Sequence, residues 1–249
     1  MDLLRCENLN KSFDGVRALD NLSIEFAQSG TTAIIGPNGA GKTSLINVLT
    51  GFLRPDSGKC FLGEREITHL SSHRIAQLGV ARTFQDLRLI LQLSVMENVM
   101  LARPNQRGER LGGALFGFGV KSDEAHNREV AAHLLEFVGL NEYASQPARE
   151  LSYGQQKLLT LACCLATDAE VLFLDEPVAG VHPAMASQIL ERLKQLRAQE
   201  KVTIFIEHDI AAVRQAADVV IVMDRGRIIA EGVPSEILDR PEIMEAYVT

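Results

Sequence analysis

The octapeptide GPNGAGKT at residues 36–43 decides the fold that this sequence predicts. It follows the β-branched run TTAIIG (31–36), which predicts a strand, and leads into the helical pattern KTSLINVLTG. A G-x-x-x-x-G-K-[ST] pattern in this context is typical of a phosphate-binding loop. Its glycines let backbone N–H groups converge on phosphate oxygens, and the helix N-terminus adds positive potential. A chance match in an ordinary loop is the alternative, and the flanking context argues against it.

The side chains of this loop suit a nucleotide with its metal ion. Lys42 is expected to reach the β- and γ-phosphates, and Thr43 to offer its hydroxyl to Mg²⁺. The candidate phosphate-contacting residues are Gly36, Pro37, Asn38, Gly39, Ala40, Gly41, Lys42, Thr43 and Ser44.

Two acids end the buried-strand pattern VLFLDE (171–176). Asp175 is predicted to hold Mg²⁺, directly or through water, and Glu176 to orient or deprotonate an attacking water. The alternative is that both acids cap the next segment. A phosphate loop on the same sheet favours the catalytic interpretation.

Two further polar residues end predicted strands. His208 lies at the end of VTIFIEHD (202–209), and Gln85 ends GVARTFQ (79–85). Ligands of open α/β sheets bind at the carboxyl ends of the strands. We therefore predict that His208 contacts the γ-phosphate and that Gln85 meets both metal and water. A structural role is the alternative for each.

The heptapeptide LSYGQQK (151–157) opens a predicted helix over Gln155–Ala166 but carries no activated nucleophile or useful acid. Its Ser-x-Gly start has the chemistry of a second phosphate-binding helix terminus. The residues alone do not explain why one chain needs two such termini.

The order of elements predicts a single domain over residues 1–249 of the α/β class. A mostly parallel sheet with flanking helices, a P-loop NTPase core, is interrupted by a helical subdomain at about 87–166. The first thirty residues and GKCFLGEREI predict antiparallel strands, and the glycine-rich stretch 104–120 predicts a mobile loop.

Composition narrows the function. The net charge of −7 argues against binding nucleic acid by charge alone. MDLLRCENLN lacks the features of a signal peptide, and the apolar run VVIVM (219–223) is too short to span a bilayer. We expect a cytoplasmic protein whose membrane role, if any, comes from a partner.

Cysteine and histidine spacing gives little support for a metal site. Cys6, Cys60, Cys163 and Cys164 lack paired C-x-x-C spacing and are expected to be buried free thiols. His69 and His73 stand four apart, a spacing that could place two ligands on one helix face. No third ligand is nearby, which argues against that site.

Taken in order, GPNGAGKT, Gln85, LSYGQ, VLFLDE and IEHD resemble the motifs of ATP-binding-cassette ATPases over essentially the whole chain. Within that superfamily the chain is similar to the cytosolic ATPases of branched-chain amino-acid and urea uptake systems. The similar segments are IGPNGAGKTSLINVLTGFLRPDSG, GVARTFQDLRLILQLSVMENVM, LSYGQQ, IEHDIAAVRQAADVVIVMDRGRIIAEGVPSEI and RPEIMEAY.

The resemblance implies an ATP-hydrolysing subunit that dimerises on ATP and powers uptake of amino acids, urea or similar polar solutes. Ser152, Gly154 and Gln155 would then cover the γ-phosphate on the phosphate loop of the second subunit, although helix capping alone remains an alternative. Phe13 would stack on adenine, or else pack in the core. The implied cofactors are ATP and Mg²⁺.

The resemblance also implies partners and a location. The partners would be a second cassette, either a copy or a sister chain, a polytopic permease and, indirectly, a periplasmic or extracellular solute-binding protein; nucleic acid is not among them. The subunit would lie on the cytoplasmic face of the membrane. The loop 104–120 would be either a solvated insertion or a contact with the permease.

Three positions depart from the family pattern. Tyr153 replaces the usual second-position glycine, and Phe13 lacks the hydroxyl of the common tyrosine. His182 stands where members usually carry Asp or Asn for contacts across the dimer, which would make these contacts pH-sensitive unless it is merely an exposed loop residue.

Two other functions remain as alternatives. One is the ATPase of a lipid or lipopolysaccharide exporter, which LDEPVAGVHP and GVPSEIL would also suit. The other is a non-transport cassette protein of translation or DNA repair. LSYGQ and the glycine-rich insertion favour uptake, and a single acidic cassette without a long coiled-coil insertion argues against the last class.

Overall fold

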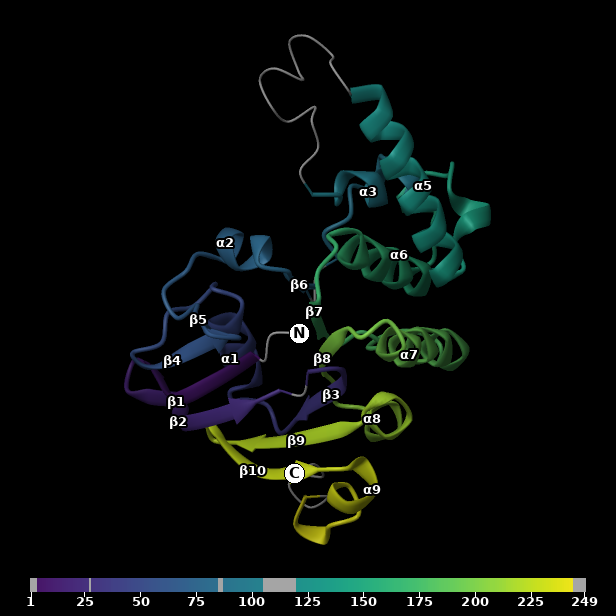
Figure 1. Cartoon of the computed structure of the whole chain (residues 1–249). Coiled ribbons are helices and arrows are strands. Elements are labelled where there is room, and N and C mark those ends of the chain that lie inside the picture. The colour runs from purple at the N-terminus through teal and green to yellow at the C-terminus, as the bar shows by residue number, and fades with distance from the viewer. Residues whose placement is uncertain (1–3, 27, 85–86, 105–119, 244–249) are drawn as a thin grey trace.

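The computed structural model describes residues 4–26, 28–84, 87–104 and 120–243. The strands in these ranges form two sheets, ordered β10-β9-β3-β8-β7-β6 and β2-β1-β4-β5 (Figure 1). The strands are β1 (Leu4–Phe13), β2 (Val16–Glu25), β3 (Gly30–Ile35), β4 (Ser57–Leu62), β5 (Arg65–Glu66), β6 (Val80–Arg82), β7 (Val171–Asp175), β8 (Val202–Ile206), β9 (Val219–Asp224) and β10 (Arg227–Gly232).

The six-stranded sheet is parallel except for β10, which pairs antiparallel with β9. Every residue of β3 and β8 is buried, which explains their unbroken apolar and β-branched sequences, because helices cover both faces of a parallel sheet. The pairs in the four-stranded sheet are all antiparallel. The predicted α/β class with an antiparallel part is confirmed.

The helices divide into a group around the central sheet and a group that projects beyond it (Figure 1). They are α1 (Lys42–Leu49), α2 (Ser72–Gln77), α3 (Val95–Leu101), α5 (Val120–Val138), α6 (Tyr153–Ala166), α7 (Pro183–Arg197), α8 (Ile210–Ala216) and α9 (Pro234–Ile237), with two short 3₁₀ turns, η2 (Asn141–Tyr143) and η3 (Ala148–Glu150).

Two hydrophobic clusters hold these layers together. One contains Leu45 of α1, Leu9 of the four-stranded sheet and Phe173 of the central sheet, so α1 is buried between the two sheets. The other joins α3, α5, α6 and α7 to the opposite face of the central sheet, around Phe205. Because α6 belongs to this second cluster, it connects the projecting helices with the core that carries the strand ends. That residues 87–166 act as a distinct subdomain remains a prediction.

Several boundaries differ from the sequence prediction. Helix α6 begins at Tyr153 rather than Gln155, because Ser152 caps it. Strand β8 ends at Ile206, so His208 lies in the connection to α8, a helix that the sequence analysis did not predict, as it did not predict α2. Most of the glycine-rich stretch, 105–119, lies outside the described residues.

The considered pairing of His69 with His73 on one helix face is wrong. Ser71 is the N-cap of α2, so His69 lies in the preceding turn and only His73 lies on the helix. Within the described ranges, no group of three or more His, Cys, Asp or Glu side chains is placed to hold a metal ion. Nor does any helix in those ranges combine the length and apolar character needed to cross a bilayer.

All four cysteines carry free thiols, as predicted, but Cys163 is partly exposed rather than buried. Cys6 of β1 lies directly opposite Cys60 of β4, with 2.8 Å between the two Sγ atoms. Burial, with a further contribution from Cys60, raises the pKa of Cys6. Although part of the Cys163 residue is exposed, burial of its thiol raises the pKa to about 12, as burial does for Cys164.

We expect these thiols to resist alkylation in the folded protein. With a pKa of about 12, only about 10⁻⁴ of a thiol is ionised at pH 8, and the thiolate is the nucleophile. Iodoacetamide at pH 8 should leave Cys163 and Cys164 unmodified in native protein and label them after unfolding in guanidinium, as read by mass spectrometry. Rapid native labelling of either residue would contradict this assignment.

Candidate phosphate-binding site

The loop between β3 and α1 has positive φ values at three glycines, Gly36, Gly39 and Gly41, a backbone that glycine adopts readily. Gly41 has φ +100°, and a Cβ there would stand 2.2 Å from the carbonyl oxygen of Ala18. Gly39 has φ +83°, yet nothing lies within 4 Å of the place where its Cβ would stand. Gly41 therefore allows the loop to pack against β2, whereas Gly39 leaves its outer side open.

Lys42 lies at the start of α1, with its side chain held across the loop. Its Nζ donates to the carbonyl oxygens of Gly36 at 2.6 Å and Pro37 at 2.9 Å. Burial lowers the pKa of Lys42, and the charges of Glu176 and Asp175 oppose that shift. The loop thus holds a cation that two acidic side chains face.

One cavity of about 440 Å³ gathers most of the predicted site residues. It is bounded by the loop, by the start of β2, by the two acids at the end of β7 and by His208 after β8. The lining residues are Val16, Arg17, Ala18, Asn38, Gly39, Ala40, Gly41, Lys42, Thr43, Ser44, Asp175, Glu176, Ile206 and His208.

Asp175 and Glu176 have different surroundings although they are neighbours in the chain. Asp175 accepts a hydrogen bond from Nη2 of Arg82 at 3.1 Å, and this ion pair is largely buried. The Oε1 atom of Glu176 lies 3.2 Å from Nε2 of His208, and both side chains are partly open to solvent. Asp175 is thus fixed by a guanidinium, whereas Glu176 and His208 face the cavity as a pair.

The backbone of Glu176 adopts the left-handed region, with φ +48°. A residue other than glycine is uncommon there and needs support from its surroundings. Its N–H donates to the carbonyl oxygen of Ile206 at 3.0 Å, and its carbonyl oxygen accepts from Nζ of Lys157. Contacts from β8 and α6 therefore stabilise this turn.

Three residues around the site were missed by the sequence analysis: Arg82, Lys157 and Glu207. Glu207 is fully buried and accepts from the N–H groups of Val178 at 2.8 Å and His208 at 3.2 Å. Burial raises the pKa of Glu207 and lowers that of Lys157. The sequence does contain a signal for two of them, because a charged residue stands in an otherwise apolar segment. Glu207 ends VTIFIE, and Lys157 lies within QQKLLTLACC.

The helix start at Ser152 is built as a capping box and lies apart from the cavity. The Ser152 Oγ atom accepts from the N–H of Gln155, whose Oε1 atom accepts from the N–H of Ser152. A Cβ at Gly154 would stand 2.4 Å from Cγ of Met185, so glycine is needed for contact with α7. Within the described part of the chain, Ser152, Gly154 and Gln155 do not line the cavity.

The structure places two of the remaining candidate residues, Phe13 and His182, outside the cavity lining. Phe13 is 46% exposed at the end of β1, so the core-packing alternative is wrong, yet it does not line the cavity. His182 is exposed and caps α7, with its Nδ1 atom accepting from the N–H of Ala184. Gln85 lies outside the described residues.

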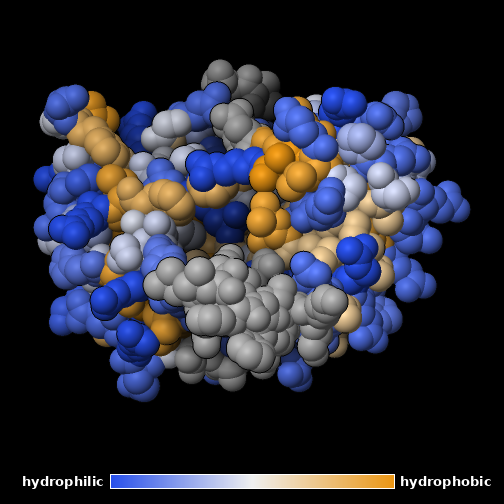
Figure 2. All heavy atoms as spheres, turned by 90° about the horizontal axis from the view of Figure 1, so that it is seen from above, coloured by the Kyte–Doolittle hydropathy of each residue, from blue (hydrophilic) through white to orange (hydrophobic). Residues whose placement is uncertain are grey.

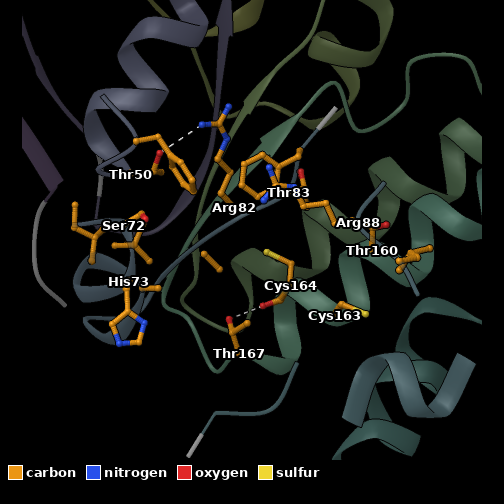
Figure 3. Close-up of a pocket in the computed structure, with 17 residues that line it drawn as sticks. Thr50, Ser72, His73, Arg82, Thr83, Arg88, Thr160, Cys163, Cys164 and Thr167 are labelled. Carbon is orange, nitrogen blue, oxygen red and sulfur yellow. Dashed lines mark hydrogen bonds between the residues drawn. The ribbon is translucent and has the colours of Figure 1, made fainter. Parts of the chain in front are cut away.

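A second hollow of about 430 Å³ lies between α2, β6 and α6, and we call it the cleft. Figure 3 shows Ser72 and His73 of α2 on one side of it and Thr160 of α6 on the other. The rings of Phe52 and Phe84 meet edge to face, with their centroids 5.4 Å apart, at this cleft. Hydrophobic side chains gather on both sides of a hollow in the view from above (Figure 2).

Arg82 lies between the cleft and the acid pair. Its guanidinium stands 5.1 Å from the ring centroid of Phe84 on the cleft side, while Nη2 bonds to Asp175 on the other. Arg88, at the cleft, stacks on the same ring at 3.5 Å. One guanidinium therefore contacts both the cleft wall and the carboxylate of the cavity.

Comparisons with known proteins agree with this arrangement. The family described as ABC transporter matches residues 19–179. The high-affinity branched-chain amino acid transport ATP-binding protein LivG of Salmonella typhimurium is 39% identical over 250 residues, covering 99% of this chain and 97% of that protein. Its counterpart BraF of Pseudomonas aeruginosa is 36% identical, covering 99% and 97%. A crystal structure of the ADP conformation of an ABC transporter cassette matches with a TM-score of 0.84 and 33% identity, covering 100% and 99%.

We expect Lys42→Ala to weaken the binding of MgATP. A hydrogen bond to a charged group contributes about 1.5–3 kcal/mol, so affinity should fall roughly 10- to 150-fold. Isothermal calorimetry measures the change, with Lys59→Ala as the control because Lys59 is an exposed residue paired with Glu66 on the four-stranded sheet. Unchanged affinity in Lys42→Ala would show that the loop is not the phosphate site.

Proposed function

This chain belongs to the ABC transporter family of ATP-binding proteins, and from that premise we propose that it is the ATPase of an uptake system for branched-chain amino acids or a similar polar solute. One observation carries the proposal: the phosphate loop, Glu176 and His208 line the same cavity. Full-length similarity to amino-acid uptake subunits favours this solute class over lipid export.

We propose that residues 36–44 hold the phosphates of ATP, with Lys42 exchanging its bonds to loop carbonyls for phosphate oxygens. The open side of Gly39 supports this assignment, because no protein atom lies within 4 Å of the place of its Cβ and a ligand can approach the loop there. Phe13 would stack on the adenine ring from its exposed position near the start of β2.

The oxygen atoms of Thr43 and Asp175 suit Mg²⁺, which prefers hydroxyl, carboxylate and phosphate ligands. When bound, the ion would neutralise charge that develops on the phosphates. The hydrogen bond from Arg82 orients the Asp175 carboxylate, which would hold the ion together with Thr43. Gln85 is the proposed further contact to metal and water.

Glu176 is the proposed general base for the attacking water, and His208 the contact to the γ-phosphate. The 3.2 Å separation between Glu176 Oε1 and His208 Nε2 supports this division, because the contact with the imidazole orients the carboxylate toward the cavity. The carboxylate can then accept a proton from water in the cavity.

Ser152, Gly154 and Gln155 are proposed to cover the γ-phosphate of a second cassette, so that two subunits complete two composite sites. These three residues are not among those that line the chain's own cavity, which supports a role in trans. Each subunit on its own would therefore bind ATP, while hydrolysis would need the pair. Residues 87–166 are the proposed helical subdomain that presents this helix start.

We further propose that the cleft receives a cytoplasmic helix of a membrane permease, which would place the subunit at the inner face of the membrane. Phe52 and Phe84 offer an apolar surface, and Arg88 adds positive charge. A permease helix with apolar and acidic side chains would complement both. A solute-binding protein would act only through that permease.

Glu176→Gln should retain ATP binding and slow hydrolysis by about 10²–10⁴-fold, the usual contribution of a positioned general base. ATP-bound dimers should then accumulate in size-exclusion chromatography. Cells that depend on this system should lose uptake of labelled leucine. Glu191→Gln, on an exposed part of α7, is the matched control. Near-normal turnover in Glu176→Gln would remove the residue from its proposed role.

Ser152→Arg should block hydrolysis while the isolated monomer still binds ATP, because a bulky cation would stand where the helix start meets the other subunit's γ-phosphate. Mixing it with Lys42→Ala places both lesions in one composite site and leaves the other site intact. Partial recovery of ATPase activity is expected if the chain pairs with itself and one intact site suffices. Loss of ATP binding in the Ser152→Arg monomer would instead assign LSYGQ to its own site.

A further inference from the structure

Helix α6 links two places that belong to different active sites in the proposed dimer, and this inference rests on that proposed function. Its start, Ser152–Gln155, would meet the partner subunit's nucleotide. Less than two turns later, Nζ of Lys157 donates to the carbonyl oxygen of this subunit's own Glu176 at 2.5 Å. The sequence analysis gave Lys157 no role.

We propose that Lys157 is a positioning residue that couples the two composite sites. It ties the start of α6 to the turn that carries Glu176, so closure of α6 on the partner's nucleotide sets the position of the general base in the chain's own site. Lys157 touches no substrate in this scheme and acts through the backbone of Glu176.

The bond is of a strong kind. Lys157 is buried, with 8% of its surface exposed, and the hydrogen bond joins an ammonium to a carbonyl oxygen away from bulk water. Charge-assisted hydrogen bonds exceed neutral ones in strength, and low local polarity strengthens them further. Burial alone favours the neutral amine and lowers the pKa of Lys157, but Glu207, Glu176 and Asp175 oppose this through their negative charge.

Two additional contacts join the start of α6 to the segment that follows Glu176. The ring of Tyr153 lies over the Lys157 ammonium, 5.5 Å from centroid to nitrogen, and its edge approaches Gly180. The absent side chain of Gly154 lets α6 press against Met185 of α7. Tyr153, which departs from the family's glycine, thus covers the ammonium and touches the segment that follows Glu176.

Glu207 holds the other end of this turn. Its carboxylate accepts from the N–H of Val178, two residues after Glu176, and from the N–H of His208. Lys157 therefore fixes the carbonyl of Glu176 from α6, while Glu207 fixes the turn from the end of β8. Because Glu176 has a positive φ, loss of either support frees it to leave the left-handed region.

The test compares Lys157→Met, Lys157→Arg and Lys201→Met in the full-length protein. Lys201 is a matched control, because its Nζ also donates to a backbone carbonyl, that of Ala169, at 2.6 Å, but at the opposite ends of the strands. Measurements are MgATP affinity of the monomer, kcat, KM and the Hill coefficient for ATP. Wild type is expected to be cooperative, with a Hill coefficient above 1 and at most about 2, the number of sites.

Lys157→Met should keep monomer affinity within about twofold, reduce kcat about 10- to 100-fold, as a misplaced catalytic group does, and bring the Hill coefficient to about 1. Lys157→Arg, which keeps the charge and donors, should restore part of the kcat and part of the cooperativity. Lys201→Met should match wild type in kcat and cooperativity. If Lys157→Met does not fold, Lys157→Gln, which keeps a neutral donor in place of the ammonium, is expected to show both losses to a smaller extent.

Other results overturn the coupling. These are a normal kcat in Lys157→Met, a reduced kcat with unchanged cooperativity, equal losses in Lys201→Met, or a wild type that hydrolyses ATP without cooperativity. In each of these cases the proposed ATPase function stands. Absence of ATP hydrolysis by the wild type would instead overturn the proposed function.

Discussion

The register of three parallel strands is the constraint on which the rest of this structure depends. Ile34 of β3 and Asp175 of β7 both lie level with Ile206 of β8. The phosphate loop, the acid pair and the segment 207–208 therefore leave the sheet at the same height and meet around one cavity. A shift of one residue in β7 would turn Asp175 to the opposite face, since side chains alternate along a strand. Burial of both sheet faces makes such a shift unfavourable.

Two hydrophobic clusters, one on each face of the central sheet, stabilise the elements at this edge. Helix α1, buried between the two sheets, fixes the phosphate loop, while α6 packs in the cluster of projecting helices and reaches the Glu176 turn through Lys157. The phosphate loop and the Glu176 turn are thus packed against different hydrophobic clusters. If Glu176 is the general base as proposed, a movement of α6 would shift that base while α1 holds the loop in place.

The sequence predicted what depends on local pattern. Loop and strand ends around Lys42, Asp175 and His208 follow from glycine spacing and apolar runs, because buried parallel strands permit few other sequences. The residues that stabilise the Glu176 turn, Lys157 and Glu207, were not predictable from the sequence. Lys157 donates to a carbonyl oxygen 19 positions away, and Glu207 accepts from backbone N–H groups whose positions depend on the assembled sheet. His69 was judged by spacing alone, and the N-cap at Ser71 moved the helix start beyond it.

Arg82 has a consequence for how such a chain can diverge. The same guanidinium packs on Phe84 at the cleft and pairs with Asp175 beside the phosphate loop. Under the proposed role of the cleft, a substitution at Arg88 would change the surface offered to a permease and leave the pair of Arg82 with Asp175 in place. A substitution at Arg82 changes both at once and leaves a buried acid unpaired. The proposed docking surface and the proposed metal-binding acid therefore share one side chain, so Arg82 cannot change to suit one of them without altering the other.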